Sequence, residues 1–177
     1  MPTPLALVAP LPPELPASLT ARAAERERLR SLHRSNLLDS GDEERFDRLT
    51  RHARIHFAVA TAIISLIAED RQYLKSFVGS FPRTVPREAA FCNVTIESED
   101  TLVVPDLLED VRFQNSPFVV GPPFIRFYAG VPLRGPGGWF VGSLCILDTE
   151  PRRLGPRELL QLRRLADQAE LEVNSTS

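Results

Sequence analysis

The stretch Val59–Val78, VATAIISLIAEDRQYLKSFV, decides the fold of this chain. Its first half, 59–68, is almost continuously apolar and rich in β-branched residues, which is typical of a strand covered on both faces. A second strand is expected at 72–78, where two sets of residues alternate: Tyr73, Lys75 and Phe77 with Leu74, Ser76 and Val78. Glu69 and Asp70 lie between the two strands as a turn. The stretch therefore predicts a β-hairpin whose first strand is central in a sheet.

A helix is predicted just before this hairpin. Apolar residues recur there at three- and four-residue steps, which predicts one apolar helix face from about 42 to 57: Phe46, Leu49, Thr50, Ala53 and Phe57. The preceding Ser40–Glu43 matches a capping box, in which the serine hydroxyl accepts the N3 amide and the glutamate reaches back. We expect the helix to begin there and to pack on the sheet.

The chain after the hairpin is less regular. Turn residues dominate between the elements, which are expected as a loop at 79–87, a short helix at 88–96, and strands at 101–104, 126–133 and 139–147. Gly135–Gly138 is the hairpin loop between the last two strands. Pro132 has no amide to donate and places its strand at an edge or a bulge.

A final helix begins at Gly155-Pro156, because proline suits the first helical position. Its apolar residues form one seam: Leu159, Leu162, Ala166, Ala169 and Val173. A seam of this spacing pairs helices in a coiled coil, so one interpretation is dimerisation through the terminal helices. In the other interpretation the seam covers the domain's own sheet.

The two ends of the chain differ from the middle. Residues 1–17 are rich in proline and predict a disordered lead, whereas 18–35 has no proline or glycine, is rich in alanine, leucine, arginine and glutamate, and predicts a helix with a narrow apolar stripe. The predicted organisation is therefore a lead, this helix, one domain over 36–173 and a tail at 174–177. The stripe on the first helix needs a partner to be stable.

Composition excludes several classes of protein. The 177 residues are 43% hydrophobic and 25% charged, which suits one folded domain, and the formal net charge is -2. Acidic residues interrupt the basic stretch 22–34, so we expect no nucleic-acid partner. No signal peptide and no membrane-spanning run is evident, and only Cys92 and Cys145 are present. These features favour a cytoplasmic location without disulfides.

Six blocks of the sequence, in order, resemble GAF domains of the type found before bacterial histidine kinase and diguanylate cyclase modules. The blocks lie between about Asn36 and Leu171 and read LLDSGDEERFDRLTRHA, ISLIAEDRQYLKSFVG, REAAFCNVTI, LVVPDLLEDVRF, IRFYAGVPL and VGSLCILDTEPRRL. The resemblance implies an α+β fold with an antiparallel six-stranded sheet flanked by helices, the terminal helices packed together. It also implies a ligand-sized cavity roofed by the irregular middle of the chain.

Independently of the resemblance, the irregular middle of the chain has features that are typical of a ligand pocket. It holds several phenylalanines among turn residues, and long ordered loops of this kind are often functional. The candidate ligand-binding residues are Phe91, Cys92, Asp106, Asp110, Phe113, Arg126 and Tyr128, with Arg112 beside them.

Each polar candidate has a structural interpretation beside the functional one. Asp106 and Asp110 suggest an acid/base pair, but an aspartate after Pro105 usually caps a turn, and we favour that role. Arg126 either binds an anionic ligand or pairs with one of these aspartates to hold the roof on the sheet. We favour the second role.

Enzymatic and metal-binding alternatives have weaker support. Some GAF proteins reduce free methionine sulfoxide with cysteine thiols, but they use a different segment, and Cys145 lies where a small buried hydrophobe is expected. Cys92 is the better candidate for a reactive thiol, and its surroundings do not match bilin-binding relatives. His52 and His56 have the spacing of a zinc half-site but no third ligand, so we expect no metal and no cofactor.

The sequence therefore predicts a non-enzymatic bacterial sensory domain that binds a small molecule or a signalling protein and forms a homodimer. A thiol enzyme of the methionine sulfoxide reductase type and a ligand-free interaction scaffold are the alternatives. The sequence motif associated with cyclic-nucleotide binding in GAF domains is absent.

Overall fold

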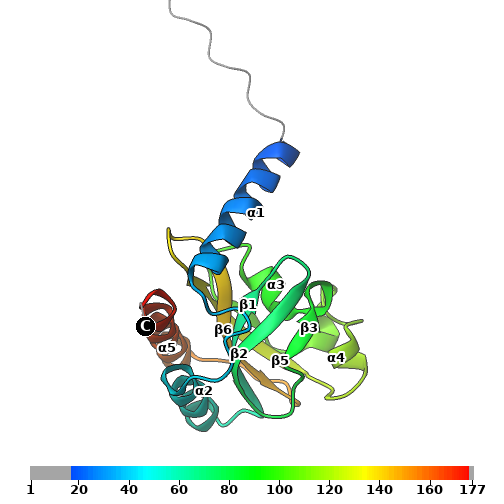
Figure 1. The fold of residues 1–177 in the computed structure, drawn as a ribbon. Helices are drawn as coiled ribbons and strands as arrows, with labels where there is room; N and C mark the ends of the chain where they lie inside the picture. Colours follow the sequence, from blue (N-terminus) through cyan, green and yellow to red (C-terminus); the bar gives the residue numbers. More distant parts are fainter. Residues whose placement is uncertain (1–16, 176–177) are drawn as a thin grey trace, which may run out of the picture.

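The computed structural model describes residues 17–175 (Figure 1). The lead predicted for residues 1–17 lies outside them, apart from Ala17, which begins the first helix. The elements, in chain order, are α1 (Ala17–Arg34), α2 (Glu44–Phe57), β1 (Thr61–Ile67), β2 (Arg71–Val78), β3 (Thr84–Pro86), η1 (Arg87–Ala89), α3 (Phe91–Thr95), β4 (Leu102–Val104), η2 (Leu107–Glu109), α4 (Pro117–Val120), β5 (Phe127–Arg134), β6 (Phe140–Asp148) and α5 (Pro156–Asn174).

The strands form one six-stranded antiparallel sheet in the order β3-β2-β1-β6-β5-β4. This is the predicted α+β fold. Every residue of β1 is buried, as the apolar run predicted, because β1 lies between β2 and β6 and is covered on both faces. The short strand β3 was not predicted, since three residues that end in Pro86 carry no strand pattern.

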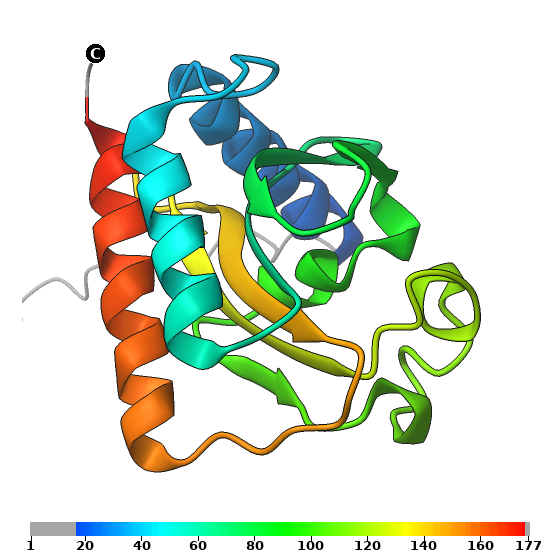
Figure 2. The same ribbon diagram turned by 90° about the horizontal axis from the view of Figure 1, so that it is seen from below.

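Each face of the sheet is covered by a different kind of structure. Helices α2 and α5 lie side by side on one face, and the segments that carry α3, η2 and α4, here called the roof (90–101 and 105–125), cover the other (Figure 2). The buried side chains accordingly form two hydrophobic clusters, one on each face. This is the arrangement that the resemblance implied.

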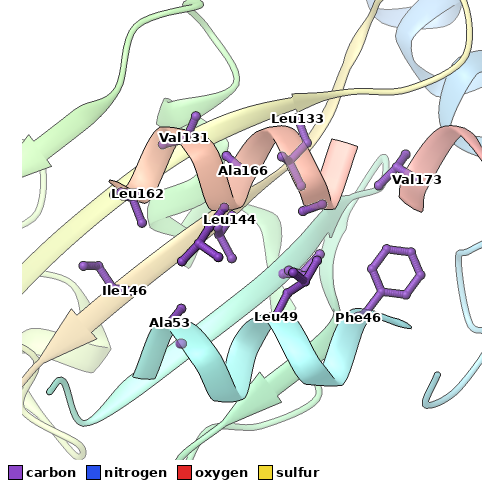
Figure 3. Close-up of a cluster of buried hydrophobic side chains, with 14 of the residues drawn as sticks. Phe46, Leu49, Ala53, Val131, Leu133, Leu144, Ile146, Leu162, Ala166 and Val173 are labelled. Atoms are coloured by element: carbon purple, nitrogen blue, oxygen red, sulfur yellow. The ribbon is translucent and has the colours of Figure 1, made fainter. Parts of the chain in front are cut away.

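The larger cluster joins α2 and α5 to the sheet. Figure 3 shows Phe46, Leu49 and Ala53 of α2 directed toward the side chains of β5, β6 and α5. All five residues of the predicted α2 face are buried. Burial of these apolar side chains stabilises the domain by roughly 1.5–3 kcal/mol for each large residue, before the entropy cost of folding.

The seam of α5 covers the domain's own sheet. Leu162, Ala166, Ala169 and Val173 are buried against β5, β6 and α2, and Leu159 is half-buried. The second of the two interpretations is therefore correct for this helix. The terminal helices were expected to pack together, but they do not. Helix α5 packs along α2, whereas α1 contacts the sheet at β6 (Figure 1).

The predicted capping box is wrong. Helix α2 begins at Glu44 with Glu43 as its N-cap, which makes no side-chain capping bond. The Ser40 hydroxyl donates instead to the Leu37 carbonyl and accepts from the ammonium of Lys75, whose Nζ lies 2.6 Å away. A partner 35 residues along the chain thus outcompetes the local cap.

Pro132 lies in β5 beyond Gly130, the last residue of β5 that pairs with β4. At Pro132 the side of β5 that faces β4 has no partner strand, which suits a residue without an amide hydrogen to donate. In residues 17–175 no helix is long and apolar enough to cross a membrane.

Candidate functional site

The roof is held on the sheet by an aromatic cluster. The Phe91 ring of α3 meets Phe113 and Tyr128 edge-on, with ring centroids 5.5 and 5.6 Å apart, and all three side chains are buried. Four of the predicted candidates therefore come together under the roof, because Cys92 belongs to the same cluster. Helix α3 contacts β5 and β6, and its buried residues are Phe91, Cys92 and Thr95.

A chain of buried polar groups runs through this cluster. The Tyr128 hydroxyl lies 2.6 Å from Thr95 Oγ1 and 3.4 Å from Cys92 Sγ, and Cys92 Sγ lies 3.6 Å from Cys145 Sγ. Tyr128 fits along its own strand because residue 130 is glycine: a Cβ there would lie 2.3 Å from the Tyr128 oxygen. The hydrogen bonds offset the cost of burying these groups.

The space between roof and sheet is small. A void of about 10 Å³ is lined by both cysteines, Tyr128, Gln72 and apolar side chains that include Phe81 and Phe118. That volume is enough for about one water molecule. The space between the roof and the sheet is therefore filled by the protein's own side chains, whereas a more open hollow of about 370 Å³ lies between residues 88–94 and 111–117.

Arg126 and Asp106 hold the roof to the sheet. The guanidinium of Arg126 donates two hydrogen bonds to the Asp106 carboxylate, at 2.8 and 2.7 Å, and the carboxylate also caps η2 by accepting from the Leu108 amide. Hydrogen bonding with Arg126 lowers the pKa of Asp106 below its usual value. These contacts support the two structural roles that we favoured, Asp106 as a turn cap and Arg126 as its ion-pair partner.

Asp110 has a separate partner. Its carboxylate accepts from the Arg112 side chain at 3.0 and 2.7 Å and from the Arg112 amide, which lowers the pKa of Asp110. A general acid needs a raised pKa, whereas these two aspartates are each held ionised by an arginine. They do not form an acid/base pair.

The histidines and the acidic residues of the described part of the chain show no metal-binding geometry. His52 and His56 are exposed on α2 with their rings stacked 5.8 Å apart. Across the part of the chain that the structure describes, no cluster of three histidine, cysteine or acidic side chains is arranged to hold a metal ion.

Sequence reasoning missed two residues of this site and one contact within it. Thr95, Gln72 and the contact of Cys145 with Cys92 were not anticipated. The signal for Cys145 is its alternation with Ser143 on the roof face of β6, next to which Ser65 of β1 lies. Gln72 carries no such signal, since a polar residue beside a turn usually faces solvent.

The comparison with family models decides the family, because the GAF domain model matches residues 43–173. The chain belongs to the GAF domain family. GAF domains are sensory and regulatory folds. A cyclic di-GMP phosphodiesterase of Pseudomonas aeruginosa is 37% identical over 131 residues, which cover 73% of this chain and 22% of that protein. The chain thus spans about a fifth of the length of this curated relative.

Solved structures share the GAF fold at low identity. The GAF domain of an Acinetobacter phosphoenolpyruvate-protein phosphotransferase matches with a TM-score of 0.60 and 16% identity, over 83% of this chain and 92% of that one. A free methionine-R-sulfoxide reductase from Thermoplasma acidophilum also matches, with a TM-score of 0.60 and 14% identity, over 72% and 89% of the two chains. At such identities the likeness concerns the fold alone.

Proposed function

We propose that this GAF domain is a regulatory module without catalytic activity, in which a small molecule or partner protein acting on the roof changes how α1 is held. The observation that carries the proposal is the position of Arg87, which bonds to the roof and to α1 together. Ligand energy changes an equilibrium only when it differs between two arrangements, and Arg87 links the two parts that would have to change.

The contacts of Arg87 support this coupling. Its guanidinium donates to Asn93 of the roof helix α3 at 2.8 Å and to Glu25 of α1 at 2.5 Å. It also donates to the Ala68 carbonyl at the end of the central hairpin, at 3.1 Å. A shift of α3 therefore changes the support of Glu25, which in turn holds Arg28.

Arg28 fixes α1 to the sheet. It donates to Glu25 at 2.8 Å and to the carbonyl of Ile67 at 2.8 Å, and it is buried. Beyond this point α1 projects from the body of the domain toward its N-terminal end (Figure 1). A small rotation at Arg28 moves that end through a larger distance.

The output is proposed from the relative and from α1. The 37% identity to a cyclic di-GMP phosphodiesterase supports a role in controlling cyclic di-GMP turnover in a bacterial cytoplasm. Ala21 and Ala24, which lie three residues apart on one side of the projecting part of α1, are both exposed. They offer a surface for a second copy, so the proposed homodimer forms through α1 and not through the seam of α5.

The void of about 10 Å³ favours a second function, a scaffold that only binds proteins, because the space under the roof is already filled. A methionine sulfoxide reductase has less support. Both thiols are buried, and a substrate the size of methionine sulfoxide does not fit in a space for one water.

Native mass spectrometry of freshly purified protein tests the proposal, since one spectrum reads the assembly mass and bound small molecules. We expect a dimer that carries a defined non-covalent adduct, released when the protein is denatured. An empty dimer would support the scaffold function. An empty monomer that shows no thermal shift with candidate ligands would contradict both.

The Glu25 junction predicts a pH effect on stability. Hydrogen bonding with Arg28, and then with Arg87, lowers the pKa of Glu25 from 4.5 to about 2 against the opposing effect of burial. Because the folded value lies below the unfolded one, the stabilisation is complete above about pH 4.5 and is lost as pH falls toward about 2. Denaturant midpoints of wild type and Glu25→Gln should therefore differ by a constant amount above about pH 4.5 and converge as the pH falls toward about 2.

The matched control for this test is Glu27→Gln, two residues further along the same helix. Glu27 pairs with Arg30 on the exposed surface, so its loss should change stability little at any pH. A gap between wild type and Glu25→Gln that stays constant with pH would show that Glu25 acts only through packing.

A further inference from the structure

Two thiols face each other beneath the roof. Cys92 in α3 and Cys145 in β6 are both free and fully buried, and their sulfur atoms are 3.6 Å apart. The bond in a disulfide is about 2.05 Å long, so the sulfurs would have to approach by about 1.5 Å. Cys145 lies in an inner strand, whereas Cys92 lies in a helix of only five residues in the roof. The roof helix is the part that can move.

Both thiols line the void of about 10 Å³, together with an unpartnered polar atom. Gln72, which is 3% exposed, also lines it, and its Oε1 has no hydrogen-bond partner among the described residues. Buried polar atoms are nearly always satisfied by the protein or by a small polar molecule. The void therefore suits a hydrogen-bond donor about the size of water that would lie against the two sulfurs.

The two cysteines differ in acidity. Burial raises the pKa of both thiols, but hydrogen bonding, first with Cys145, outweighs it at Cys92 and lowers the pKa of Cys92 to about 6. The pKa of Cys145 stays well above its usual value. Because the thiolate is the nucleophile, Cys92 is the attacking residue of the pair.

We propose that Cys92 and Cys145 are an oxidation site, at which hydrogen peroxide, little larger than the water that the void can hold, enters when the roof opens and converts the two thiols to a disulfide. The Cys92 thiolate attacks one peroxide oxygen, the O–O bond breaks, and the leaving oxygen takes a proton to become water. The Cys145 sulfur, losing its proton, then attacks the Cys92 sulfenic acid and releases water. Two thiols and one hydrogen peroxide thus give one disulfide and two waters.

The way into the void passes two aromatic rings. Phe81 and Phe118 line it, are only half-buried, and pack against each other with ring centroids 5.0 Å apart. Because these two large lining side chains are partly exposed, we expect the oxidant to enter where the rings part. Oxidation of the two thiols should therefore be slow, and small oxidants should react faster than large ones.

A disulfide here would draw α3 onto β6. Asn93 follows Cys92 directly and is bonded to Arg87, so the movement reaches the junction with α1. The oxidation site itself does not depend on the proposed regulatory function, because disulfide formation is measured on the domain without any output.

The test is intact-mass analysis of the native full chain after treatment with hydrogen peroxide. We expect a loss of about 2 Da, the mass of two hydrogens, reversed by a reductant, and a peptide linking Cys92 to Cys145 after digestion. Cys145→Ser should instead gain about 16 Da at Cys92, in a form that a sulfenic-acid reagent traps. Unmodified thiols, oxygen adducts without the linked peptide, or a disulfide between two chains would overturn the proposal.

A second pair of variants tests the entrance and needs no cysteine replacement. Phe118→Ala should speed disulfide formation several-fold, because it opens the wall of the void. Phe124→Ala is the matched control, since Phe124 is 55% exposed in the same roof and does not line the void. Equal rates in these two variants would contradict entry of the oxidant past the phenylalanine pair.

Discussion

Replacing Gly142 by alanine is expected to lower the free energy of unfolding by more than about 4 kcal/mol, a large effect for a single substitution. Gly142 lies in β6, where it is paired with β1 and β5 on its two sides. A Cβ at this position would lie 1.8 Å from the Ser65 carbonyl oxygen and 3.0 Å from the Leu66 Cα. Both are backbone atoms of the central strand, so relief requires the sheet itself to separate.

Urea unfolding followed by circular dichroism measures this effect, and the amount of soluble protein is a second readout. Gly155→Ala is the control, because the nearest atom to its new Cβ is the Glu158 carboxylate at 3.7 Å. It should change stability by less than about 1 kcal/mol. If Gly142→Ala unfolds at the same urea concentration as wild type, the close approach of β1 and β6 is not present in solution.

Replacing Lys75 by alanine is expected to destabilise the domain by about 3–4 kcal/mol. The side chain is completely buried in β2. Its ammonium donates to Ser40 Oγ, to the Gly41 carbonyl and to the Glu43 carboxylate at 2.6–2.7 Å, and it lies 5.3 Å from the centre of the Phe46 ring. Removal leaves these acceptors without their donor and opens a cavity beside the ring.

Lys75→Met separates the two contributions, because methionine keeps most of the apolar stem and loses the charge. We expect it to cost about 2 kcal/mol, less than alanine, since Glu43 is partly exposed and water can replace the ammonium there. Unfolding midpoints in urea, with equal m values, report the difference. A methionine variant as stable as wild type would assign the whole effect to the stem.

Local patterns were enough to predict most of the fold. The apolar run of β1 and the helix face of α2 predict the burial that the structure shows, whereas the alternation of β2 predicts the strand but not its burial, since 72–76 is buried on both faces. The start of α2 was mispredicted for a different reason. The acceptor groups of Ser40 and Glu43 are taken by Lys75, which is near them only after the sheet has formed.

Some residues of the candidate site were predictable from the sequence, but the contacts between them were not. Phe91, Cys92, Phe113 and Tyr128 were grouped because they lie in the irregular middle of the chain or beside it, and they share one buried cluster. The contact between the two cysteines spans 53 residues of sequence and depends on where α3 lies on β6. The size of the void depends on how side chains pack, and no pattern in the sequence records that.

The two outer strands of the sheet have a consequence for the behaviour of the protein at high concentration. Strands β3 and β4 are three residues long, Pro86 ends β3, and Pro105 follows β4 directly. A long free edge invites another chain to add a strand, which begins aggregation, and proline has no amide with which to extend such pairing. The domain can therefore be packed beside many copies of itself while each sheet stays separate.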